Sequence, residues 1–179
     1  MDSLGKSRSH GRIGEAAVFA KCWMHGIPAY STGGLRSNFA GSDLIVETAD
    51  PRKKLWVQVK TGASTLKDHV YLTQGTEEDL SEAKFKTDFV VFVDLDLRTA
   101  KSHSHDGTLD FSSMSYYVVP VKEANRLFRA ALERLATKPK RDGTPRKLTN
   151  IGVVVPNASM EQYRDAWDSL KSASGAGGS

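Results

Sequence analysis

The sequence predicts an α/β fold in which a mixed central sheet is flanked by helices. Three observations predict it: an apolar-rich helical stretch over residues 11–25 that ends at Gly26, two apolar runs at residues 43–48 and 54–61, and a near-continuous apolar run at residues 88–95. An apolar run without polar alternation is typical of a central strand covered on both faces. The expected core is therefore a helix, three strands, a helix and a further strand.

Shorter patterns predict the other elements of this core and of the C-terminal part. A first short strand is expected at residues 28–32, before the two apolar runs. Residues 122–136 repeat apolar side chains at the spacing of an amphipathic helix. The remaining expected elements are a helix at 77–86, strands at 115–121 and 151–155, and a final helix at 160–170.

Length and composition favour a single domain. A chain of 179 residues suits one hydrophobic core. Residues 1–10 are polar and residues 172–179 are rich in Gly and Ser, so we expect disordered ends around one domain at residues 11–171. The sequence has no membrane-length apolar run and no apolar signal region, which favours a cytoplasmic protein without a membrane partner. The single cysteine, Cys22, excludes an internal disulfide and is expected to fill the core.

The candidate site lies in the two apolar runs, which the polar residues 49–53 join as a hairpin turn. Asp43 opens the first run, and Gln58 and Lys60 lie two residues apart in the second. Because side chains alternate between the faces of a strand, Gln58 and Lys60 project to one side and Asp43 can converge on them. Oxygen atoms of Asp43, Gln58 and the Val59 carbonyl would suit Mg²⁺ or Mn²⁺. Lys60 would then stabilise negative charge or orient water during hydrolysis of a phosphodiester.

Asp43, followed fifteen residues later by Gln58-Val59-Lys60, resembles the PD-(D/E)xK nuclease superfamily. The pattern is most similar to the branch of archaeal-type Holliday junction resolvases and related small endonucleases. That branch places a glutamate on its first helix, where this chain has Glu15. The resemblance implies that Asp43 and Gln58 hold the metal and that Lys60 is catalytic. It also implies that Glu15 is an outer or second-metal ligand.

The resemblance covers about residues 10–95 and implies a restriction-endonuclease-like αβββαβ core. Two positions depart from the superfamily pattern. Ser42 stands where the motif has proline, and Gln58 stands where it has an acidic residue. The chain therefore carries a Gln-x-Lys variant of the motif, with one negative charge fewer and a weaker expected affinity for metal.

Each site residue also has an ordinary structural interpretation. Asp43 has the position of a turn residue at a strand start, and Lys60 that of a solvated lysine that protects an edge strand. The helix dipole favours Glu15 in a first helical turn. However, Glu15 falls on the same side as Val18 and Phe19, where we expect partial burial and where an unpaired carboxylate is costly.

Two segments supply candidate contacts to DNA in a chain of net charge +4. Residues 138–147 hold five basic residues and one acidic residue, together with Pro and Gly that predict a loop. Such a loop suits phosphate contacts, although a solvated surface loop has the same composition. A second loop over residues 33–41 leads directly into the site. The candidate DNA-binding residues are Arg36, Asn38, Lys138, Lys140, Arg141, Arg146 and Lys147.

The sequence therefore predicts a Mg²⁺-dependent DNA endonuclease that acts on branched junctions or on a specific duplex. Substrates with two-fold symmetry imply a homodimer. Two alternatives stay open: a catalytically inactive nucleic-acid-binding relative, in which Gln58 marks the loss of metal, and an interaction or regulatory protein on the same fold. Metal affinity and salt-sensitive DNA binding distinguish these alternatives.

Overall fold

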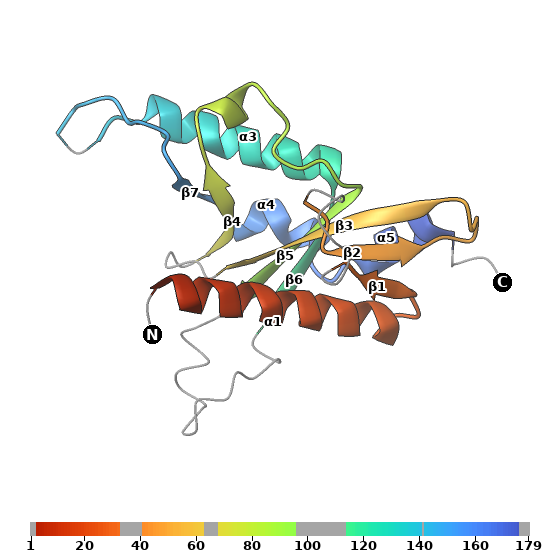
Figure 1. Cartoon of the computed structure of the whole chain (residues 1–179). Helices are drawn as coiled ribbons and strands as arrows, with labels where there is room; N and C mark the ends of the chain where they lie inside the picture. Colours follow the sequence, from red (N-terminus) through yellow and green to blue (C-terminus); the bar gives the residue numbers. More distant parts are fainter. Residues whose placement is uncertain (1–2, 33–40, 63–67, 96–113, 141, 176–179) are drawn as a thin grey trace.

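A five-stranded mixed sheet forms the centre of the molecule in the computed structural model (Figure 1). The structure describes residues 3–32, 41–62, 68–95, 114–140 and 142–175, with side chains of the first helix from residue 10 onward. The strands follow the order β1-β2-β3-β5-β6. Their bounds are Ala29–Ser31 for β1, Leu44–Glu47 for β2, Lys54–Gly62 for β3, Phe89–Leu95 for β5 and Met114–Pro120 for β6.

The pairing within this sheet confirms the predicted fold class. Strands β1, β2 and β3 are antiparallel neighbours, β3 and β5 are parallel, and β5 and β6 are antiparallel. The hairpin expected at residues 49–53 joins β2 to β3, with Leu44 opposite Val57. The near-continuous apolar run forms β5, which is buried along almost its whole length because helices cover both of its faces.

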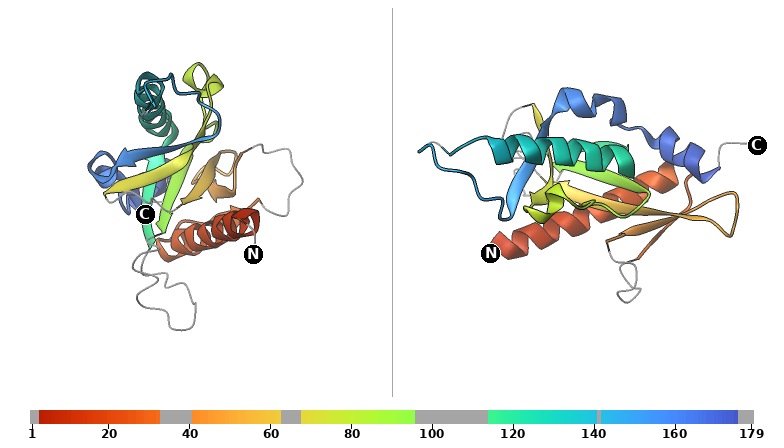
Figure 2. Two further views of the ribbon diagram at one scale, coloured as in Figure 1. Left: turned by 90° about the vertical axis from the view of Figure 1, so that its left-hand side faces the viewer. Right: turned by 90° about the horizontal axis from the view of Figure 1, so that it is seen from above.

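Two helices cover the two faces of the sheet, as Figures 1 and 2 show. Helix α1, Ser3–Met24, packs on the face that carries Val91 and Val93 of β5. Helix α3, Val121–Thr137, packs on the opposite face, which carries Val90 and Phe92. The alternation of side chains along β5 thus divides the core into two layers.

Helix α1 is longer than its apolar pattern predicts. It begins at Ser3 rather than near residue 11, so most of the N-terminal segment expected to be disordered is helical. Its end matches the prediction, because Gly26 adopts a left-handed conformation with φ 68°. The Ile27 N–H donates to the Cys22 carbonyl at 2.8 Å and the Gly26 N–H to the Trp23 carbonyl at 3.0 Å. This pattern is a Schellman motif, for which glycine is the favoured residue.

The helix expected at residues 77–86 is absent, and this prediction is wrong. The segment holds only a short 3₁₀ turn, η1, Glu78–Leu80. Farther along it, the side chain of Asn125 on α3 pins the backbone of Phe85, accepting from its N–H and donating to its carbonyl, both at 3.0 Å. These bonds replace the backbone hydrogen bonds that a helix would need. The connection from β3 to β5 therefore differs from the expected αβββαβ order.

A second, two-stranded sheet pairs β4, His69–Gly75, with β7, Ile151–Pro156. The sequence predicts β7 but not β4. Because α3 packs against β7, this small sheet and α3 share the core layer that also contains Val90 and Phe92. The small sheet therefore extends the side of the molecule that α3 covers.

The single helix expected at residues 160–170 is also wrong. The segment is divided into α4, Asn157–Met160, a 3₁₀ turn η3, Glu161–Tyr163, and α5, Trp167–Ser174. The break occurs because the backbone pairs with β6: Arg164 bridges to Tyr117, and the Asp165 N–H donates to the Tyr116 carbonyl at 2.8 Å.

Helix α5 extends into the tail that was expected to be disordered, and its buried Trp167 and Leu170 join the core on the α1 side. None of the helices in the described part of the chain combines the length and apolarity needed to cross a membrane.

Candidate active site

The backbone and side chain of Asp43 are fixed between two neighbouring strands. Its N–H donates to the Val57 carbonyl at 2.9 Å, and its carbonyl accepts from the Thr32 N–H at 2.9 Å. Its carboxylate oxygen Oδ2 accepts a 2.6 Å hydrogen bond from the N–H of Val59. The hydrogen bond uses Oδ2, so Oδ1 remains for a ligand. Asp43 therefore has a defined orientation before any substrate binds.

The Val59 carbonyl lies at the same edge as the Asp43 carboxylate. Along β3, Trp56 exchanges hydrogen bonds with Asp88 on the β5 side, whereas the Val57 carbonyl accepts from Asp43 on the β2 side. Because the backbone groups of successive strand residues alternate between the two edges, the N–H and carbonyl of Val59 both point toward β2. The first residue of β2 is Leu44, opposite Val57, so Val59 lies where the β2–β3 pairing ends.

The side chains of Gln58 and Lys60 lie on the sheet face that α3 covers. In the parallel pairing, Gln58 lies beside Val90 and Lys60 beside Phe92, both of which belong to that core layer. The Gln58 amide nitrogen is 3.4 Å from the position that a Cβ on Gly41 would take. The Gln58 amide thus lies against the segment that leads into the aspartate of the site.

Lys60 is half-buried, and burial lowers its pKa. The positive charge of Lys84 lowers this pKa further, while the negative charges of Asp43 and Glu15 act in the opposite direction. A lysine in such surroundings releases its proton more readily than a solvated one. These influences place Lys60 within electrostatic range of both carboxylates.

Glu15 reaches the site from α1, on the other face of the sheet. Burial raises the pKa of its carboxyl group, and the charge of Asp43 raises it further, whereas Arg12 and Lys60 lower it. Burial likewise raises the pKa of Asp43, although the Val59 N–H and Lys60 act to lower it. The charges of Asp43 and Lys60 therefore both act on Glu15, and the charge of Lys60 acts on Asp43, so the three groups lie within electrostatic range of one another.

Gly14 sets how closely α1, and with it Glu15, approaches β3. Gly14 shares a stripe of the helix with Lys21 and His25, a pattern that predicts a solvent-facing position, yet Gly14 is buried. A Cβ added at Gly14 would lie 1.8 Å from Oγ1 of Thr61 and 2.9 Å from its Cβ. The same Thr61 hydroxyl is buried and has no hydrogen-bond partner in the described part of the chain. The contact between helix and strand is therefore too close for any side chain.

Gly14→Ala should destabilise the protein by about 2 kcal/mol, because the added methyl group overpacks a tight contact. Gly11→Ala is a matched control, since nothing lies within 4 Å of a Cβ at that position of the same helix. The control should gain up to about 1 kcal/mol from better helix propensity. Urea denaturation measures both effects. If both variants had the same free energy of unfolding, the close contact between Gly14 and Thr61 would be contradicted.

The donor atoms at this point suit a hard divalent cation. Among the described residues no group of three or more His, Cys, Asp or Glu side chains gathers in one place. The available oxygens are the carboxylates of Asp43 and Glu15, the Gln58 amide and the Val59 carbonyl. Mg²⁺ commonly binds through one or two carboxylates, with water and substrate phosphate completing the octahedron. The set therefore fits Mg²⁺ or Mn²⁺, and it contains no soft ligand that would favour zinc.

A shallow depression of about 320 Å³ adjoins the Glu15 carboxylate, lined by Arg12, Glu15, Ala16, Phe19, Ser31 and Leu44. The sequence did not single out Arg12 or Lys84. Arg12 lies one turn before Glu15 on α1, so the helical spacing alone could have predicted that the two side chains are neighbours. Lys84 lies in an irregular segment held by an ion pair to Asp79 at 2.9 Å, and no sequence pattern links it to Lys60.

The predicted DNA-binding residues are only partly described. Arg36, Asn38 and Arg141 lie outside the described residues. Lys138, Lys140 and Lys147 are exposed, and Arg146 is half-buried with its Nε atom enclosed and without a partner among the described atoms. The exposed lysines are therefore better placed for phosphate contacts than Arg146.

Comparisons with known proteins find a relative in fold. Neither protein-family models nor curated proteins give a match to this chain. Among solved structures, the chain is similar to a bacterial homing endonuclease, I-Ssp6803I, with a TM-score of 0.50 and 17% sequence identity. The similarity covers 96% of this chain and 97% of the endonuclease chain. The chain thus has the mixed α/β architecture of an endonuclease fold over nearly its whole length.

Proposed function

We propose that the protein is a metal-dependent DNA endonuclease of the PD-(D/E)xK type. The observation that carries this proposal is the convergence of Glu15, Asp43 and Lys60 where the pairing of β2 and β3 ends. Carboxylates that hold a metal ion, together with a nearby lysine, suit phosphodiester hydrolysis because the reaction develops negative charge on the phosphate. Structural roles alone do not require two half-buried carboxylates beside a half-buried lysine.

Each residue has a proposed task in the reaction. Asp43, with Oδ2 held by the Val59 N–H, presents Oδ1 to the metal, and the Gln58 amide and Val59 carbonyl supply neutral oxygens. Glu15 contributes from the α1 side as an outer ligand. When bound, Mg²⁺ or Mn²⁺ would polarise a phosphoryl oxygen and acidify a water molecule. Lys60 orients the attacking water or stabilises the charge on the scissile phosphate.

Two substrate classes follow from this proposal. The name of the structural relative, a homing endonuclease, favours double-stranded DNA. The likeness of the motif to that of junction resolvases favours branched DNA. In either case one site cuts one strand at a time, so cutting both strands in a single binding event would suit two copies of the chain.

Gln58→Glu should raise the affinity for Mn²⁺ by about tenfold, because it adds a charged oxygen to a site with few carboxylates. Isothermal titration of wild type and variant measures the change. Gln74→Glu, an exposed position in β4, is the charge-matched control and should leave metal binding unchanged. Equal metal affinity in wild type and Gln58→Glu would show that Gln58 does not contact the metal.

A second candidate function is DNA binding without cleavage. The observation that favours it is Gln58 itself, which supplies a neutral amide where the nuclease motif has an acidic residue. Such a protein would bind DNA in a salt-dependent way but bind divalent cations weakly. The fold and the basic loop at residues 138–147 would be the same in both cases, so DNA binding alone does not distinguish the two functions.

The test is cleavage of three labelled substrates by the wild-type protein: supercoiled plasmid, linear duplex and a four-way junction. Each is incubated with Mg²⁺, with Mn²⁺ or with EDTA. Cutting that needs the metal supports the nuclease, and the preferred substrate gives its class. A folded protein that binds DNA but cuts none of the three with either metal would favour the non-catalytic function instead.

A further inference from the structure

The positive charge of the chain is concentrated in α3 and the loop that follows it. Residues 122–147 contain nine basic and three acidic residues, whereas the rest of the chain contains sixteen basic and eighteen acidic residues. Without this segment the net charge of the chain would be negative. A local excess of this size produces a positive potential over one part of the surface.

A groove of about 390 Å³ runs between α3 and β7 within this basic region. Arg126, Arg134 and Lys138 line one side of it. Together with Ala130 they recur every four residues, so they form one stripe along the helix. Leu127 and Val155 contribute apolar surface to the groove.

Two of the three cations on this stripe have no ion-pair partner among the described residues. Arg126 pairs with Glu123 at 2.8 Å. Arg134 and Lys138 are exposed and, within the described ranges, neither forms an ion pair. Unpaired cations beside a groove attract a ligand with regularly spaced negative charges. Lys138 is also the first residue of the basic loop, so the groove and the loop are continuous.

We propose that this groove binds the phosphate backbone of nucleic acid and extends the substrate footprint beyond the cleavage site. The proposal rests on the proposed nuclease function, because it assigns the groove to the same DNA. Charge complementarity favours phosphates over an uncharged partner, and backbone contacts supply affinity without reading sequence.

The groove and the cleavage site occupy different parts of the molecule. The groove lies beside α3, β4, β7 and α4, whereas Glu15 lies on α1, across the sheet. A 30-base-pair duplex is about 100 Å long, compared with a diameter of roughly 40 Å for a domain of this size. A duplex of this length is nearly straight. It can contact both regions along one side of the molecule, because Gln58 and Lys60 of the cleavage site lie on the sheet face that α3 covers.

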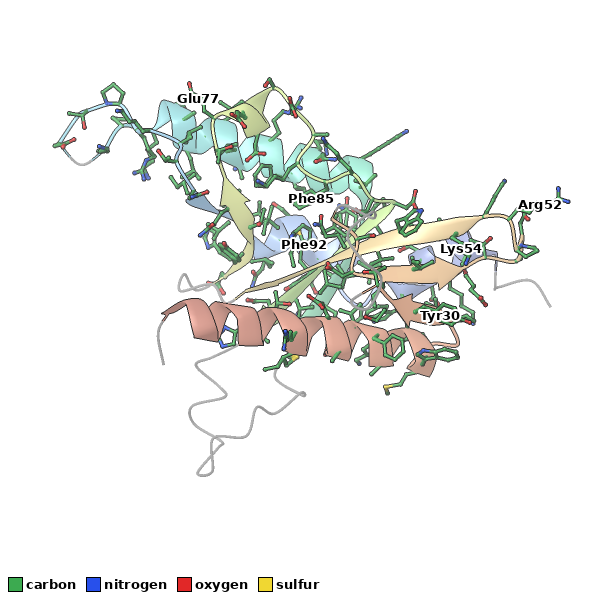
Figure 3. All side chains as sticks on the ribbon, viewed as in Figure 1. Tyr30, Arg52, Lys54, Glu77, Phe85 and Phe92 are labelled. Carbon is green, nitrogen blue, oxygen red and sulfur yellow. The ribbon has the colours of Figure 1, made fainter. Side chains whose placement is uncertain are left out.

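The experiment compares two double variants that remove equal charge. The groove variant is Arg134→Gln with Lys138→Gln. The control is Arg52→Gln with Lys54→Gln, at the exposed β2–β3 turn labelled in Figure 3. Affinity for a 30-base-pair duplex is measured in EDTA, which prevents cutting, over a range of salt concentrations. Thermal unfolding verifies that both variants are folded.

The groove variant should bind about tenfold more weakly near 0.15 M salt, with a salt slope reduced by about 2, as the loss of two phosphate contacts requires. The control should stay within twofold of wild type. Exchange of the two cations, Arg134→Lys with Lys138→Arg, should retain wild-type affinity. Equal losses of DNA affinity in the groove and control variants, or no loss in either, would contradict DNA binding by the groove.

Cleavage by the wild type separates this inference from the proposed function. If the wild type cuts DNA in a metal-dependent way and the groove variant binds DNA as tightly as the wild type, the nuclease function is supported and the groove does not bind DNA. If the groove variant alone loses DNA affinity and the wild type does not cut DNA, the groove binds DNA but the proposed nuclease function is wrong.

Discussion

Lys60→Ala is expected to lower the single-turnover rate of DNA cleavage by about 10³-fold, because it removes the cation proposed to orient water or to stabilise negative charge on the scissile phosphate. DNA affinity in EDTA should change little, since most affinity comes from many phosphate contacts elsewhere. A variant that loses cleavage and DNA binding to the same degree would indicate a binding lysine rather than a catalytic one.

The stability of the Lys60→Ala variant separates a catalytic role from a structural one. The folded-state pKa of Lys60 is lowered, chiefly by burial, so the fold disfavours its charged form at neutral pH. Removal of the ammonium group should therefore cost little stability, and thermal unfolding at pH 7 should show this. Lys86→Ala, an exposed lysine shortly before β5, is the control and should cut DNA at the wild-type rate.

Asp43→Asn is expected to abolish metal binding and to reduce cleavage by at least about 10³-fold, because the one carboxylate fixed at the end of the β2–β3 pairing is lost. The asparagine oxygen can still accept the hydrogen bond from the Val59 N–H, so the local backbone should be preserved. Titration with Mn²⁺ measures binding, and Asp168→Asn, an exposed carboxylate on α5, is the control. Undiminished metal affinity in Asp43→Asn would show that Asp43 does not bind the metal.

The same substitution has a defined pH dependence of stability. The folded-state pKa of Asp43 lies above its ordinary value of 3.8, mainly through burial. A carboxyl group with a raised pKa costs stability when it is ionised, and this cost disappears as the pH falls below the ordinary value. Without added metal, Asp43→Asn should therefore unfold at or above the wild-type temperature at pH 7, with no such advantage near pH 3. A lower midpoint at pH 7 would show that the ionised aspartate stabilises the fold.

The β2–β3 hairpin is the part of the structure that the sequence predicts best. Strand alternation places Gln58 and Lys60 on one face, and the polar turn brings Asp43 beside them; both follow from local rules. Glu15 is predicted by a longer argument, because a carboxylate on the partly apolar side of a helix needs a partner. The influence of Asp43 and Lys60 on the pKa of Glu15 is consistent with that reasoning.

The failures of prediction have tertiary causes. Strand β4 exists because it pairs with β7, about eighty residues later, and no local pattern carries that information. Gly14 lies on a stripe with polar residues and looks solvent-facing, yet it marks the closest approach of α1 to Thr61. The expected helix at 77–86 is lost to the bonds between Asn125 and Phe85, which join segments forty residues apart.

The measurement that tests the central claim most directly is the single-turnover cleavage rate of the double variant Asp43→Asn with Lys60→Ala, beside wild type and both single variants. Residues that act as one catalytic unit give effects that do not multiply. We predict metal-dependent cutting by the wild type and a double variant no slower, within about threefold, than the slower single variant. A wild type that does not cut, or single effects that multiply in full, would contradict one shared active site at the end of the β2–β3 pairing.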